Sequence, residues 1–102
     1  MHEHRAGRII TVTVEGELDL LTAPKLAAQV DQLVRAEAVD VVLDLDETLF
    51  IDSAGLSILL NLQRRLDRRG HRLRVVCDDG PVRRVIEMAR LEDTLGLVPI
   101  PT

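Results

Sequence analysis

Short apolar runs typical of β-strands alternate with longer segments of helical period along this chain. Strand-like runs are expected at residues 9–14, 17–20, 41–45, 71–77 and 97–100. Helices should follow Thr22, run from Ser53 to about Arg69, and open at Gly80-Pro81. Such alternation implies βαβ units with right-handed crossovers. We therefore predict an α/β fold with the order ββαβαβαβ, in which helices pack over a mixed, mostly parallel β-sheet of about five strands.

Each expected helix carries one apolar face, which it should bury against the sheet. Thr22 is placed to cap the first helix, and Gly70 to end the second. The side chains that we expect to be buried recur at helical spacing: Leu26, Ala27, Val30, Leu33 and Val34 in the first helix, Leu56, Leu59, Leu60, Leu62 and Leu66 in the second, and Val82, Val85, Ile86 and Ala89 in the third.

Length and composition favour one domain over residues 1–102, with residues 1–7 as a flexible terminus. A net charge of -4, with one Phe and neither Trp nor Tyr, provides neither the positive field nor the stacking surface typical of nucleic-acid binding. No apolar run approaches the ~20 residues of a membrane span, and the N-terminus lacks the apolar stretch of a secretory signal. We expect a cytoplasmic protein.

Two further features have structural interpretations. The arginines at positions 64, 65, 68 and 69 lie at the end of the second helix, where cations are favoured by the helix dipole, although a phosphate or lipid site is the alternative. Cys77 is the single cysteine and lies in an apolar run, so we interpret it as a core residue.

The stretch FIDSAGLSIL at residues 50–59 places a small polar cluster within an apolar region. Its position between a strand and a helix puts the cluster at a helix N-terminus, where N–H groups are unpaired. Asp52 or Ser53 can cap this helix, while Ala54 and Gly55 leave its first turn open to approach. Plain capping is one interpretation. The other is a functional site with a Ser53 hydroxyl that is reachable from solvent.

The combination of elements resembles the STAS-domain family, specifically its anti-sigma factor antagonists. The resemblance rests on residues 41–45 and 49–56, followed by the leucine-rich helix and Gly70. It extends to residues 16–19, to the helix after Pro24, and to residues 80–82 and 91–97, so nearly the whole chain is covered.

The resemblance implies a binding switch. Such proteins bind an anti-sigma factor that is also a serine kinase, which frees the sigma factor; the kinase phosphorylates the antagonist, and a serine phosphatase reverses the reaction. Ser53 occupies the position of the phosphorylated serine, Asp52 matches its acidic neighbour, and Gly55 matches the motif glycine. Asp19 resembles an acidic residue that the family keeps near the phosphorylation site. The preceding loop, residues 46–49, is more acidic than the family pattern, which leaves partner choice open.

By accessibility of a helix start, Ser53 is preferred as phosphoacceptor over Ser57 and Thr48, and Thr48 can also be interpreted as a turn residue. Exposed residues on the second helix share the face nearest the motif and are expected to shape partner choice, with ordinary solvated surface as the alternative for each: Ser57, Asn61, Arg64 and Arg65. The expected partner-binding set is Asp19, Asp52, Ser53, Ala54, Gly55, Ser57, Asn61 and Arg64.

Other functions are less favoured. Ser53 lacks a Gly-x-Ser-x-Gly elbow, and the three histidines form no evident triad, so we do not expect an enzyme. Asp44 and Asp46 are better explained as residues at a strand end than as a metal-dependent phosphoacceptor, and we expect no metal or other cofactor. Within the same fold, the alternatives are a support subunit of a lipid-transport ATPase complex and a stressosome-type scaffold subunit. The oligomeric state stays open.

Overall fold

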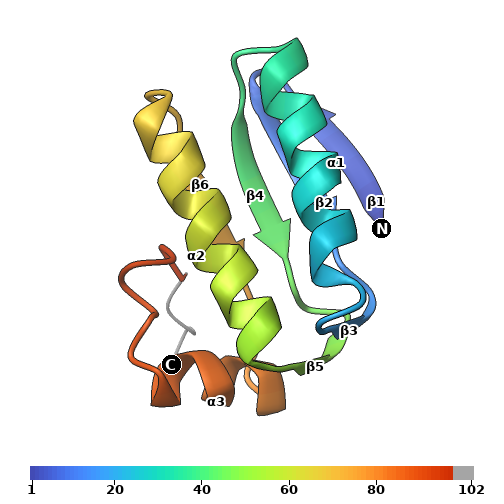
Figure 1. The fold of residues 1–102 in the computed structure, drawn as a ribbon, viewed down its shortest axis with the longest axis vertical. Coiled ribbons are helices and arrows are strands. Elements are labelled where there is room, and N and C mark those ends of the chain that lie inside the picture. Colours follow the sequence, from blue (N-terminus) through green and yellow to red (C-terminus); the bar gives the residue numbers. More distant parts are fainter. Residues whose placement is uncertain (98–102) are drawn as a thin grey trace.

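In the computed structural model, which describes residues 1–97, six strands and three helices form an α/β fold (Figure 1). The elements are β1 (His2–Ala6), β2 (Ile9–Thr13), β3 (Gly16–Leu18), α1 (Ala23–Ala36), β4 (Asp40–Asp44), β5 (Thr48–Ile51), α2 (Ser53–Arg68), β6 (Leu73–Val76) and α3 (Pro81–Met88). The strand expected at 97–100 begins at the last described residue and otherwise lies outside the described range.

The strands form two sheets. The larger has the order β1-β2-β4-β6, with β1 antiparallel to β2 and the other two pairings parallel, while β3 and β5 form a separate parallel pair. Our prediction of one mostly parallel sheet of about five strands is therefore corrected to six strands in two sheets. The missed strand β5 has four residues and its partner β3 has three, which is too short for a period of two to be recognised.

The N-terminus is also corrected. We predicted a flexible terminus over residues 1–7, but residues His2–Ala6 form β1 and pair with β2 along their whole length. Gly7, at φ +62°, makes the turn. All five β1 side chains are exposed. The strand therefore lacks the alternation of apolar and polar residues from which a strand is predicted. Side-chain contacts from β1 to α1 and its C-cap accompany the backbone pairing, including Glu3 with Gln29 at 2.6 Å and Arg5 with Glu37.

Helices α1 and α2 lie together over one face of the larger sheet, and the core lies between these layers (Figure 1). The helices contribute Leu26, Val30, Leu59, Leu62 and Leu66, each at most 1% exposed. The strands contribute alternate residues to the same layer, which are Ile10, Val12, Val41, Leu43, Leu73 and Val75. Cys77 is buried with them, as predicted.

The opposite face of the larger sheet has no helix over it among the described residues (Figure 1). The alternate side chains of β2, β4 and β6 that point to this face are half-buried or exposed, in contrast to the buried residues of the helix side. Ile9, Val42 and Arg74 line a shallow depression of about 280 Å³ there. The sheet is thus covered on one side only, which sheets with antiparallel pairs tolerate.

Helix ends follow the sequence signals with one exception. Gly70 has φ +76° and follows α2, and Gly80-Pro81 opens α3, as predicted. Thr22 is the N-cap residue of α1, but its side chain makes no capping hydrogen bond. Its hydroxyl instead donates to the Glu17 carbonyl at 2.7 Å and so fixes the β3–α1 loop. No helix within residues 1–97 has the length and apolar character needed to cross a membrane.

Candidate functional site

The parallel pair β3–β5 brings the predicted site residues together. Leu18 of β3 is in register with Ile51 of β5, so the residues that follow them, Asp19 and Asp52, leave adjacent strand ends. Neighbouring strands lie about 5 Å apart, so the two aspartates are placed close to each other. Ser53 comes next and is the first residue of α2. The site therefore lies where β3, β5 and α2 meet (Figure 1).

Asp52, rather than Ser53, caps α2. One carboxylate oxygen of Asp52 accepts a hydrogen bond from the Gly55 N–H at 2.9 Å, which satisfies one unpaired donor of the first turn. The Asp52 carbonyl accepts from the Leu56 N–H at 3.0 Å and so begins the helical ladder. Ser53 is exposed, as predicted, and its hydroxyl is not used by the cap. The structure thus presents a serine hydroxyl at a helix start.

Gly55 has a different role from the one that we predicted. It is buried, so it contributes no exposed surface for a partner. A Cβ atom at this position would lie 2.3 Å from the carbonyl oxygen of Leu18 and 2.7 Å from Cγ1 of Ile51. Only glycine allows the first turn of α2 to approach β3 and β5 this closely. Gly55 therefore helps to hold Ser53 in position, and its predicted part in partner binding stays a prediction.

Asp19 fixes the loop between β3 and α1. Its carboxylate accepts hydrogen bonds from the N–H groups of Leu21 and Thr22, at 3.0 and 3.1 Å, and from the Thr22 hydroxyl. The hydrogen bond from the Thr22 backbone is the largest cause that lowers the pKa of Asp19 below its ordinary value. The side chain is therefore ionised at neutral pH and held in one orientation beside the Ser53 end of α2.

Four exposed apolar side chains, which we did not predict as part of the site, lie next to its residues in the sequence. Leu20 and Leu21 are 72% and 77% exposed in the loop after β3, and Leu49 and Phe50 are 77% and 50% exposed on β5. We call these four residues the apolar surface. No alternating pattern could have identified them, because the two central residues of β5 are both exposed and β5 pairs, within residues 1–97, only with the three-residue strand β3.

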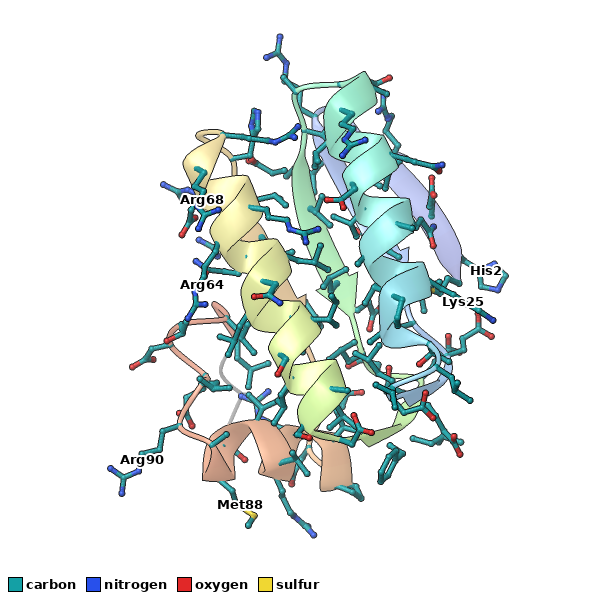
Figure 2. All side chains as sticks on the ribbon, in the orientation of Figure 1. His2, Lys25, Arg64, Arg68, Met88 and Arg90 are labelled. Atoms are coloured by element: carbon teal, nitrogen blue, oxygen red, sulfur yellow. The ribbon has the colours of Figure 1, made fainter. Side chains whose placement is uncertain are left out.

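The exposed ridge of α2 continues from Ser53 through Ser57, Asn61 and Arg64, at spacings of three or four residues. All three lie in the predicted partner-binding set and all are exposed, whereas Ala54 is half-buried. Arg64 and Arg68 extend from α2 on the side away from α1 (Figure 2).

Thr48 is not an accessible phosphoacceptor. It is 7% exposed, and its hydroxyl donates to the Val14 carbonyl at 2.7 Å. The interpretation of Thr48 as a turn residue is corrected, because it is the first residue of β5 and joins that strand to the end of β2. Ser57 is exposed and stays a possible acceptor beside Ser53.

Other polar groups of the predicted chemistry do not converge on Ser53. Asp46 accepts a hydrogen bond from the Asp78 N–H at 2.7 Å, and burial, with the charges of Asp44 and Asp78, raises the pKa of Asp46. Burial raises the pKa of the Cys77 thiol to about 11. Within residues 1–97, no three His, Cys, Asp or Glu side chains are grouped in a way that could hold a metal ion.

The chain is similar in sequence and in fold to several known proteins. A family model described as the STAS domain matches residues 3–100. An anti-sigma F factor antagonist of Paenibacillus polymyxa is 33% identical over 91 residues, covering 87% of this chain and 76% of that protein. A crystal structure of an anti-sigma factor antagonist from Mycobacterium paratuberculosis has a TM-score of 0.84 at 29% identity, covering 97% of this chain and 84% of the other. The phosphorylated form of the Bacillus cell fate determinant SpoIIAA shares the fold, with a TM-score of 0.73 at 19% identity and coverage of 98% and 90%. This chain belongs to the STAS-domain family.

Proposed function

We propose that this protein is an anti-sigma factor antagonist that binds an anti-sigma factor with serine kinase activity and is switched off by phosphorylation of Ser53. The observation that carries the proposal is the exposed Ser53 at the first position of α2, with Asp52 rather than the serine acting as the cap. Further support comes from the family relatives, two of which are named as anti-sigma factor antagonists.

The unphosphorylated protein docks through the Ser53 end of α2. The contact surface consists of Asp19, Asp52, Ser53, Ala54, Ser57, Asn61 and Arg64, with the apolar surface beside it. Apolar side chains exposed in a group mark interaction surfaces in soluble proteins. Docking occupies the anti-sigma factor and so releases the sigma factor for transcription, a role that places the protein in the cytoplasm and makes it a regulator rather than an enzyme.

Phosphorylation blocks docking without unfolding the domain. A phosphate on Ser53 adds about -1.5 to -2 charges at a helix N-terminus, where the dipole and the free N–H groups favour an anion. In the complex, however, that dianion beside Asp52 must lose its water or face carboxylates of the partner; at ~6 Å and an effective dielectric near 20, one pair of like charges costs roughly 3 kcal/mol before screening. A loss of ~4 kcal/mol weakens binding about a thousandfold. A serine phosphatase then restores the binding form.

The test begins with the purified protein, a candidate anti-sigma factor kinase and ATP, with the modified residue located by mass spectrometry. Phosphate should appear on Ser53 in the wild type and in Ser57→Ala, and should be absent in Ser53→Ala. The phosphoprotein should bind the same partner about a thousandfold more weakly, with an unchanged circular dichroism spectrum.

Two results contradict the proposal. Unchanged affinity of the phosphoprotein removes the switching mechanism. Stable co-purification with a transport ATPase, without any phosphorylation of Ser53, favours a support subunit instead.

A further inference from the structure

A second concave surface lies at the opposite end of α2, between the C-terminal ends of α1 and α2. It is a cleft of about 330 Å³ lined by Asp31, Arg35, Arg65, Arg68 and Arg69, which we call the arginine cleft. Arg35, Arg65 and Arg69 thus face one carboxylate in a protein whose net charge is -4, while the Arg68 side chain extends on the side of α2 away from α1 (Figure 2). The Ser53 site lies a whole helix length away, so neither the apolar surface nor the predicted partner-binding set lines this cleft.

Helix dipoles alone do not account for so many cations. Each helix C-terminus carries about half a negative charge, so α1 and α2 together offset roughly one arginine. Asp31 offsets one more. About one positive charge remains over the cleft, and the groups that line it do not neutralise it.

Two of the arginines are held in place. Arg65 forms an ion pair with Asp31 across the two helices at 2.7 Å. The Arg69 guanidinium donates to the Val34 carbonyl at 3.4 Å, near the end of α1. These contacts restrain both side chains. The two side chains would therefore lose less conformational entropy when an anion binds. Arg35 is exposed on the α1 side, whereas Arg68, also exposed, extends away from α1 (Figure 2).

The side chains that line the arginine cleft indicate which class of ligand it can bind. Guanidinium groups match the oxygen pairs of phosphate in a bidentate geometry, and several of them around one hollow suit several linked phosphates. The cleft is lined by no exposed apolar side chain that could insert into a membrane. We infer that the arginine cleft binds a small soluble oligophosphate, independently of the function proposed for Ser53.

The test is isothermal titration calorimetry of the full chain with inorganic tripolyphosphate at about 20 mM salt, where screening is weak. The cleft variant Arg35→Gln/Arg69→Gln leaves the Arg65–Asp31 ion pair intact. The control Arg84→Gln/Arg90→Gln changes the net charge equally but alters exposed residues outside the cleft lining. Circular dichroism establishes that both variants are folded.

The wild type should bind one tripolyphosphate per chain, and pyrophosphate more weakly. The cleft variant should lose affinity about tenfold, because two charge-assisted contacts are removed, whereas the control should stay within about twofold. Absence of saturable binding to the wild type, or equal losses in the two variants, would overturn the inference. So would binding to vesicles containing an anionic phospholipid without binding to tripolyphosphate, which would identify a lipid surface as the ligand.

Discussion

Replacing Gly55 with alanine should destabilise the domain by moving the first turn of α2 away from β3. The added methyl group would lie 2.3 Å from the Leu18 carbonyl oxygen and 2.7 Å from a side-chain carbon of Ile51. Carbon and oxygen atoms at ordinary contact are more than 3 Å apart, so the backbone must shift by about 1 Å. The affected carbonyl also accepts the Asp52 N–H at 3.4 Å, and this bond would be lost.

Three effects set the magnitude. Insertion of a methyl group into a packed site costs about 1–3 kcal/mol. Loss of the hydrogen bond adds about 1 kcal/mol, and the higher helix propensity of alanine returns up to about 1 kcal/mol. The net expectation is a loss of about 2 kcal/mol in the free energy of unfolding, or about 8–16 °C in Tm for a domain of this size.

Urea denaturation followed by circular dichroism at 222 nm measures this change in a chain without tryptophan. Ser57→Ala is the matched control, because it alters an exposed residue of the same helix and should stay within about 0.5 kcal/mol of the wild type. If Gly55→Ala were as stable as the wild type, α2 could start elsewhere without strain, and our account of why glycine is needed beside Ser53 would be refuted.

Three further predictions concern single side chains. Asp52→Ala removes the cap and should cost about 1 kcal/mol in urea denaturation, whereas Asp52→Asn keeps an acceptor for the Gly55 N–H and should recover most of it. Asp19 has a lowered pKa in the folded state, so its stabilising contribution is present above its ordinary value of 3.8 and is lost as the pH falls through the folded value. Asp19→Ala should therefore lower the urea midpoint at pH 7, with the gap to the wild type closing in acid; a gap independent of pH would contradict this. The Cys77 thiol, with a pKa of about 11, should react with a thiol reagent at pH 8 only after the protein is denatured, and rapid labelling of the native protein would show that it is not buried.

The sequence predicted the elements whose apolar pattern is long. The starts of α2 and α3 came from capping and proline signals, and the strand at residues 41–45 from an apolar run, because these signals are local. The strands β1 and β5 were missed because neither contains a local signal. β1 has no buried side chain, and β5 is defined by its pairing with three distant residues of β3.

At the candidate site, too, the features set by local sequence were predicted and those set by contacts between distant residues were not. The exposure of Ser53 followed from its place at a helix start. The burial of Gly55 did not, because it depends on how closely α2 approaches Leu18, a contact between residues far apart in the chain. The apolar surface likewise depends on which sides of β5 and of the β3–α1 loop face solvent, and for β5 this depends on the packing of α3 rather than on composition.

Because one face of the larger sheet has no helix over it, residues that point to its two faces should tolerate substitution to different degrees. Residues such as Val12 and Leu43 are completely enclosed, and each change there disturbs several neighbours at once. Thr11 and Val42 belong to the same strands but point the other way, toward water. Within one strand, therefore, every second position can drift during evolution or accept a probe or tether, while its neighbours stay constrained.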